Sequence, residues 1–447
     1  MSTMLQVGTS YRAILKIAGP IALALLVPQL NLITNSIFLG YHSERSLAFA
    51  SLTGIYYLAF AAFGFGLNNG LQTLLSRRAG QNQQHEIGPY FTQAVIIALV
   101  SSAGGIALTF LLAPPVFKTF LHPDQANEAL SFLWIRIFGL PFLYVYQLRN
   151  ALLVSINRSR LLILGTLAEA VANVIFDYVL IFGKLGLPAM GFNGAAMASV
   201  ISEFIGMVTI FLVIKRQGIT NQFSLFSTLR PHPERIRLII KLSSPLIFQH
   251  CASVVAWLFF YFLIARNANQ TGLAISTTMR AVFGFFGAFF WSLAATTNTM
   301  VSNVIGQGLY SEVLPLVKRI TRLSFLIALA ICFFFWLTPE LYLSLFRADP
   351  SFIEEGKPVL RTVGLAILIL SAGTVWLNTV TGTGNTRVTF AVEIFALVFY
   401  CLYVFYVMEI QHLSIIWGWA SELLYWSFLL GGSYYYLTRR DWTKKII

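Results

Sequence analysis

The most prominent pattern in the chain is a series of long apolar segments separated by short polar ones. A membrane-spanning helix needs about 20 mainly apolar residues, and twelve segments approach or exceed that length. They cover residues 12–40, 46–75, 88–113, 128–153, 161–183, 191–214, 238–265, 272–303, 321–337, 358–381, 388–407 and 413–437. The pattern therefore predicts an all-α polytopic membrane protein with twelve transmembrane helices.

The composition favours the same class of protein. Of the 447 residues, 57% are hydrophobic and only 11% are charged, whereas soluble proteins carry about 25% charged residues. Cys251, Cys332 and Cys401 all fall in apolar segments, so we expect small buried side chains and no disulfide framework. The first apolar segment has no small-residue cleavage site after a short apolar core, and we expect it to act as its own insertion signal.

The formal net charge of +13 is explained by where the basic residues lie. If the N-terminus is cytoplasmic, 21 of the 30 lysines and arginines lie in inner loops and at inner helix ends, and seven lie in outer loops. By the positive-inside rule, this bias predicts a multi-pass protein of the cell (inner) membrane with both termini in the cytoplasm. The charge thus indicates orientation, and we expect no nucleic-acid partner.

The chain also contains an internal repeat. "TLLSRRAGQNQQHE" (73–86) aligns without gaps to "TMVSNVIGQGLYSE" (299–312), at an offset of 226 residues. Similar pairs at an offset of 225 are "KIAGP" (16–20) with "KLSSP" (241–245), and Pro114 and Asp124 with Pro339 and Asp349. The repeat predicts two six-helix lobes, 1–215 and 238–447, joined by a cytoplasmic linker over 216–237. Because six is even, the pseudo-two-fold axis should run along the membrane normal, as in transporters with parallel repeats.

The most unusual apolar segment is "ANVIFDYVLIFG" (172–183), which contains a carboxylate. Asn173 and Asp177 are four residues apart and share one helical face, which Glu169 extends by a turn. An ionised aspartate in mid-membrane costs about 3 kcal/mol, so it should face protein or a water-filled cavity. Burial favours the neutral form of an acid and a nearby cation favours the charged form. Asp177 could therefore alternate between a proton, a sodium ion and a cationic substrate.

Four sets of residues carry a family resemblance: "LLSRRAGQNQQHE" (74–86), "ANVIFDYVLIFG", "GFNGAAMAS" (191–199), and "IFLG" (37–40) followed by "LAFASL" (47–52). Together they resemble the multidrug and toxic compound extrusion (MATE) family, and the similarity extends over essentially the whole chain. The resemblance implies secondary active efflux of organic, often cationic, compounds by alternating access. It also implies exchange for protons or sodium ions, with no cofactor beyond the coupling ion.

The resemblance also implies a cation site. In the family, an asparagine and an aspartate four apart on the fifth helix contribute to this site, and Asn173 and Asp177 match them. A second aspartate usually comes from the first helix, in a stretch like "VDTIFVG", but this chain has "TNSIFLG" with Asn35. We expect weaker metal binding, or a second acid supplied by Glu169. A sodium ion would need oxygen ligands from Asp177, Asn173, Asn35 and Asn31. Alternatively, these polar residues only hold helices together.

Several other residues are candidates for the cavity or for gating. Pro20 and Pro28 fall within the first helix, where they favour a kink. Asn68 and Asn69 are possible cavity donors. Arg280 lies in the eighth apolar segment, where it should face a cavity or, as we expect, form an ion pair with an acid.

In the second lobe, Glu393 and Glu422 lie within apparent spans. We expect them to form salt bridges with arginines at helix ends. The alternative is a second cation site, although the seventh and tenth segments lack the acids that one branch of the family carries there.

Two other functions compete with export. A flippase for a lipid-linked saccharide or another amphipathic lipid should show several cavity arginines, and only Arg136 and Arg280 qualify here. A membrane enzyme would need metal-ligand spacing or a catalytic constellation, and the sequence shows neither, so we expect no enzyme. The expected partners are a small organic substrate and membrane lipids, and we expect a monomer.

Overall fold

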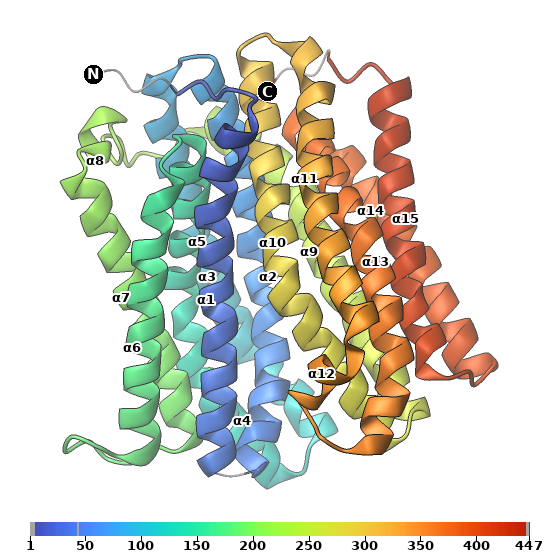
Figure 1. Cartoon of the computed structure of the whole chain (residues 1–447). Coiled ribbons are helices and arrows are strands. Elements are labelled where there is room, and N and C mark those ends of the chain that lie inside the picture. The colour runs from blue at the N-terminus through green and yellow to red at the C-terminus, as the bar shows by residue number, and fades with distance from the viewer. Residues whose placement is uncertain (1–4, 43, 444–446) are drawn as a thin grey trace. The chain divides into compact units, whose positions relative to one another are not determined.

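The computed structural model describes residues 5–42, 44–443 and 447, and these residues form long helices joined by short turns, without a strand among them. Figure 1 shows the helices within each unit running roughly side by side. In chain order they are α1 (Tyr11–His42), α2 (Glu44–Gly80), α3 (Gln84–Phe120), α4 (Pro123–Arg136), η1 (Ile137–Gly139), α5 (Leu140–Ser155), η2 (Ser159–Leu161), α6 (Leu162–Phe182), α7 (Phe192–Arg216), α8 (Ile219–Gln222), α9 (Pro233–Asn267), α10 (Gln270–Gly306), α11 (Tyr310–Leu337), α12 (Pro339–Ser344), α13 (Pro350–Thr383), α14 (Thr386–Phe405), η3 (Tyr406–Ile410) and α15 (Ile415–Arg439).

The all-α prediction is confirmed. Within two residues, every predicted span falls in one of these helical segments; the fourth spans α4, η1 and α5, and the eleventh spans α14 and η3. Ten helical stretches in the described part of the chain are long and apolar enough to cross a membrane. Helices satisfy their own backbone hydrogen bonds, which a bilayer interior requires. The chain is thus a multi-pass membrane protein.

The internal repeat is visible in the helix boundaries. Helices α2 and α10 each contain 37 residues, and both begin and end at positions 226 apart. The next helices, α3 and α11, begin at Gln84 and Tyr310, again 226 residues apart. The two halves of the chain therefore begin these two successive helices at equivalent positions.

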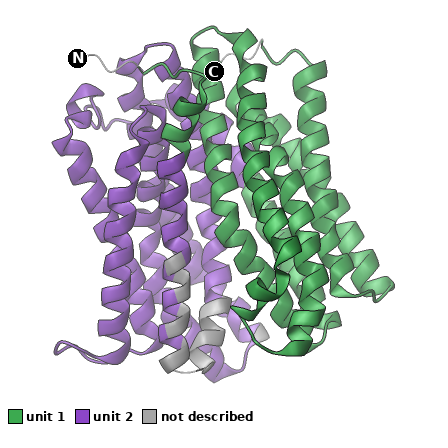
Figure 2. Cartoon of the chain, in the orientation of Figure 1, with its two compact units in different colours: residues 1–18, 248–447 green, residues 19–247 purple. Residues whose placement is uncertain are grey.

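The chain forms two compact units, shown in Figure 2. Unit 2 contains residues 19–247, and unit 1 contains residues 1–18 and 248–447. The divisions fall inside α1 and α9, so each of these helices contributes to both units.

In unit 1, the segment before α1 is bound to the ends of α10 and α11. The Asn303 side chain accepts a hydrogen bond from the Val7 amide (3.1 Å) and donates one to the Leu5 carbonyl (3.0 Å). Arg319 donates to both the carbonyl and the hydroxyl of Thr9. These bonds satisfy backbone groups of a non-helical segment in which Leu5 and Val7 are buried.

In unit 2, the segment after α7 is bound in a similar way to α3. Gln93 accepts from the His232 amide (2.9 Å) and donates to the Arg230 carbonyl (3.1 Å). Gly88 approaches the Phe223 carbonyl so closely that a Cβ would lie 1.9 Å from its oxygen. Much of the segment predicted as a cytoplasmic linker is therefore packed against α3.

Candidate functional site

Helix α6 presents the polar face that the sequence predicts. Asn173 is 3% exposed and Asp177 is fully buried. The helix ends at Gly183, whose φ of +65° is in the left-handed region and whose missing Cβ leaves room for the backbone of Ala189. Asp177 thus lies within the last two turns of a rigid helix.

Asn35 of α1 reaches this face. When its side-chain amide is oriented so that the nitrogen meets the surrounding oxygens, it donates to Asn173 Oδ1 (2.9 Å), to the Asn31 carbonyl (3.1 Å) and to Asp177 Oδ2. The structure therefore brings Asn35, Asn173 and Asp177 together, and it places the main-chain oxygen of Asn31 beside them.

The two oxygens of Asp177 have different surroundings. Oδ2 accepts from Asn35, whereas the buried Oδ1 has no hydrogen-bond partner among the described residues. Asn173 donates its amide to Ser202 Oγ of α7 (3.3 Å), and Ser202 in turn donates to the carbonyls of Ala198 and Ser199. We did not predict Ser202, because one serine in an apolar helix gives no local signal. We call Asn35, Asn173, Asp177 and Ser202 the α1–α6–α7 cluster.

Glu169 does not join this cluster. It lies eight residues before Asp177, about 12 Å along the helix axis. There it packs on Gly206, where an added Cβ would lie 2.9 Å from the Glu169 Cβ, and its electrostatic neighbours include Tyr146 and Arg149. The three polar residues of α6 share a face, but their partners differ.

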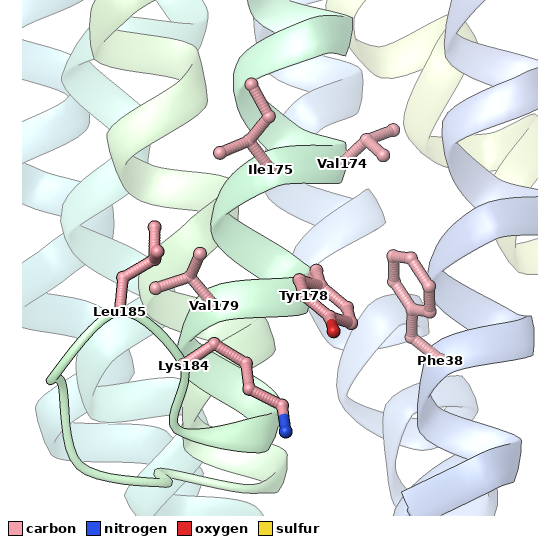
Figure 3. A pocket seen from close by; sticks show the side chains of 7 residues that line it. All are labelled: Phe38, Val174, Ile175, Tyr178, Val179, Lys184 and Leu185. Atoms are coloured by element: carbon pink, nitrogen blue, oxygen red, sulfur yellow. The ribbon is translucent and has the colours of Figure 1, made fainter.

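An apolar groove of about 570 Å³ lies between α1 and α6 beside the cluster. Figure 3 shows the ring of Phe38 facing that of Tyr178, and Lys184 is the basic residue of the lining. Phe38 also packs edge-on against Phe182, with ring centroids 6.1 Å apart. The groove is lined by Phe38, Val174, Ile175, Tyr178, Val179, Lys184 and Leu185.

Arg136 forms a buried ion pair in unit 2. Its guanidinium makes two hydrogen bonds to the Glu203 carboxylate, of 2.9 and 2.6 Å, and lies 3.7 Å from the centroid of the Tyr57 ring. Gly139 makes room for the pair, since a Cβ there would lie 2.3 Å from the carboxylate. Arg136 is therefore neutralised by the protein itself.

The remaining candidates of the first half are two asparagines of α2 and two prolines of α1. Asn68 accepts from the Ala151 amide (3.0 Å) and donates to Asn69 Oδ1 (3.3 Å), so it links α2 to α5. Pro20 and Pro28 both lie inside α1, which continues as one helix through them.

The ion pair that we expected for Arg280 is not formed with any residue that the structure describes. Its guanidinium lies 5.6 Å from the ring centroid of Tyr261, and the side chain is exposed. A cation–π contact takes the place of the acid.

The salt bridges predicted for Glu393 and Glu422 are wrong for the described part of the chain. Glu393 accepts from Ser253 Oγ (2.9 Å), Gln249 Nε2 (3.3 Å) and the Tyr425 hydroxyl. Glu422 accepts from the indole of Trp426 (2.9 Å). Both acids are buried, and neither forms an ion pair with a described arginine.

Comparison with known proteins decides the family. The family model MatE matches the chain twice, over residues 20–179 and 245–405, which together make up most of its length. The chain belongs to the MatE family. The two matched regions are themselves about 225 residues apart, in agreement with the repeat. This member of the MatE family is thus a membrane transporter built from two copies of one helical unit.

Comparisons with individual proteins are consistent with this family. Over 383 residues, the chain is 24% identical to "Probable multidrug resistance protein NorM" of Thermotoga maritima, covering 84% of this chain and 80% of the relative. Its fold is similar to that in "Crystal structure of MATE in complex with MaL6", with a TM-score of 0.89, 17% identity and coverage of 98% and 97% of the two chains. It is also similar (TM-score 0.88, 17% identity, coverage of 99% and 98%) to a transporter of the MOP superfamily from Pyrococcus furiosus, described under the words "reverse polarity of binding pocket suggests different function".

Proposed function

We propose that this transporter exports amphipathic organic cations in exchange for protons, with Asp177 as the carboxylate that carries the coupling proton. The observation that carries the proposal is the state of Asp177, which is fully buried and has one oxygen without a partner among the described residues. Because burial removes the water that would stabilise a charged carboxylate, gaining or losing a proton strongly changes the electrostatic energy of such a group. The names of the relatives support a multidrug substrate range.

The cluster favours a proton over a sodium ion. A sodium site needs several oxygens that point at one place, whereas the hydrogen-bonded assignment of the Asn35 amide directs its nitrogen at Asp177 and at the Asn173 oxygen. Asn35 thus uses two oxygens that a sodium ion would need. An aspartate at this position would supply a second charge, whereas Asn35 supplies a donor that compensates one ionised carboxylate.

Protonation of Asp177 would weaken the link between α1 and α6. A hydrogen bond to a charged group contributes about 1.5–3 kcal/mol and one to a neutral group about 0.5–1.5 kcal/mol. The Asn35–Asp177 hydrogen bond is therefore stronger when Asp177 is charged, so the protonation state of Asp177 changes how firmly α1 is held to α6. Helix α1 contains Pro20 and Pro28. In the proposed cycle, a proton from outside neutralises Asp177 and accompanies substrate release. The proton leaves toward the cytoplasm before the next substrate binds.

The flippase alternative is less well supported. It requires free arginines for a pyrophosphate, and Arg136 is already paired with Glu203. Of the two arginines that the sequence offered, Arg280 alone has no acid partner among the described residues. From the charge bias we also propose the cell membrane as the location, with both termini in the cytoplasm. A monomer as the working unit is a separate proposal.

The test is cationic dye efflux from proteoliposomes under imposed gradients. We expect a pH gradient to drive efflux by the wild type and by Asp124→Asn, which makes the same chemical change at the start of α4 outside the cluster. We expect no gradient-driven efflux by Asp177→Asn, although this variant should fold and bind dye. Wild-type efflux by Asp177→Asn would overturn the coupling role. Efflux driven by a sodium gradient without a pH gradient would overturn the proton assignment.

A further inference from the structure

A second apolar groove, of about 330 Å³, lies in unit 1 between α14 and α15, which pack against each other. Figure 1 shows these two helices at one side of the helices of unit 1. The groove is lined by Val388, Ala391, Val392, Phe395, Phe428, Gly432, Tyr435, Tyr436 and Arg440. It has no part in the α1–α6–α7 cluster.

Small residues open the groove and aromatic rings close one end of it. Gly432 faces Val392, whose methyl carbon would lie only 3.0 Å from an added Cβ. Phe395 and Phe428 meet edge-to-face with ring centroids 5.4 Å apart. The lining thus follows both helices, with Phe395 and Phe428 at the end away from Arg440.

The open end is basic. Arg440 belongs to the lining, Arg387 lies one turn before Ala391 on α14, and Arg439 lies one turn beyond Tyr435 on α15. All three arginines are exposed, and none of them forms an ion pair with a described residue. The nearby acid is Asp441, whose carboxylate accepts from the amide and hydroxyl of Thr443. One acid beside three arginines leaves the mouth positively charged.

We infer that this groove binds one phospholipid with an anionic headgroup, with an acyl chain along its length and the phosphate at Arg387, Arg439 and Arg440. The stretch from Phe428 to Arg440 rises about 18 Å, close to the roughly 15 Å depth of one leaflet's hydrocarbon region. The apolar lining suits an acyl chain and offers little to a soluble anion. Anionic lipids are attracted by arginines at the membrane surface. Tyr435 and Tyr436 lie within about one turn and a half of Arg440, and tyrosine is a residue type enriched at the membrane interface.

The test is lipid binding, so its result does not depend on transport. Purified full-length protein in a zwitterionic detergent is titrated with phosphatidylglycerol, and bound lipid is counted by native mass spectrometry. We expect Arg387→Gln with Arg440→Gln to weaken binding at least tenfold. The matched control is Lys318→Gln with Arg322→Gln, which removes the same charge from exposed positions of α11 and should bind as the wild type does.

A second pair of variants tests the groove itself. Ala391→Phe fills the groove from an exposed position, and Leu402→Phe adds a ring to an exposed position of α14 outside it. We expect the first to abolish specific lipid binding and the second to leave it unchanged. Unchanged binding in the arginine variant, equal binding of phosphatidylcholine, or full competition by glycerol phosphate would each overturn the proposal. Loss in the arginine variant without loss in Ala391→Phe would also overturn it, because the arginines would then act without a seated chain.

Discussion

Asn35 on α1 donates a hydrogen bond to the carboxylate of Asp177 on α6, and the same amide donates to the oxygen of Asn173. One side chain therefore compensates the charge of Asp177 and connects two helices. A second carboxylate at position 35 could not do this without a proton or a metal ion between the two acids.

Asn35→Asp should create a sodium-dependent protein. Two carboxylates in contact repel each other unless a cation lies between them, so sodium should bind and stabilise the folded state. At sodium concentrations of 10–100 times the Kd, the gain is about 1.4–2.7 kcal/mol. The measurement is the thermal midpoint in sodium chloride against choline chloride. The control is Asn193→Asp, because Asn193 Oδ1 already accepts from Ser131 Oγ outside the cluster. Equal midpoints in the two salts for Asn35→Asp would contradict the prediction.

Breaking the Arg136–Glu203 pair should destabilise unit 2 strongly. Arg136→Gln leaves a buried, uncompensated carboxylate and should cost about 3–5 kcal/mol. Combining Arg136→Met with Glu203→Leu should restore much of the loss, because apolar residues of similar volume need no charge partner. Free energies of unfolding in graded detergent mixtures give the comparison. A double variant less stable than Arg136→Gln would contradict the interpretation of Arg136 and Glu203 as a buried ion pair.

The two buried glutamates of unit 1 should differ in their response to substitution. Glu393→Leu leaves the Gln249 amide and the Tyr425 hydroxyl without this acceptor, while Ser253 keeps its bond to the Gln249 carbonyl, and Glu422→Leu leaves one donor without an acceptor. Each donor left without a partner costs about 1–3 kcal/mol, so we expect the larger loss at position 393. Glu393→Gln should be mild, since the hydroxyls of Ser253 and Tyr425 can reverse their bonds. Thermal unfolding of the three variants would show this order, and equal losses at 393 and 422 would contradict it.

Gly183 and Gly186 offer a matched test of the turn that ends α6. Both have a positive φ, so an alanine at either costs about 1–2 kcal/mol of backbone strain. At Gly183 the new Cβ would also lie 2.6 Å from the Ala189 nitrogen, whereas nothing lies within 4 Å at Gly186. We expect Gly183→Ala to be clearly less stable than Gly186→Ala in thermal unfolding. Equal stability of the two variants would show that the close approach to Ala189 relaxes without cost.

Much of the fold could be predicted because a bilayer imposes one structural solution on apolar segments. The helix boundaries were less predictable. Helix α3 extends from Gln84 to Phe120, well beyond the predicted 88–113. Its first turn is polar and gives no hydropathy signal, and Pro114 and Pro115 lie inside the helix although proline usually marks a helix boundary. The break between α4 and α5 was missed because it falls inside a continuous apolar segment. The short helices α8 (4 residues) and α12 (6 residues) were missed because they are too short to show a periodic pattern.

The candidate site was predictable only where residues are close in the chain or the family resemblance supplies them. Asn173 and Asp177 share a face by spacing alone, and the resemblance added Asn35. Ser202 and the pairing of Arg136 with Glu203 depend on contacts between helices far apart in the sequence, which periodicity does not encode. The salt bridges expected for Glu393 failed because hydroxyl and amide donors from α9 and α15 satisfy this acid instead.

Because α1 and α9 are each divided between the two units, cutting the chain into two halves would divide both units. A cut in the segment 216–237 would leave residues 5–18 on one fragment and the unit they pack in on the other. The second fragment would likewise carry residues 238–247, which pack with unit 2. We therefore expect the two half-proteins to be complementary fragments that become stable when produced together, and to be rapidly degraded when produced alone.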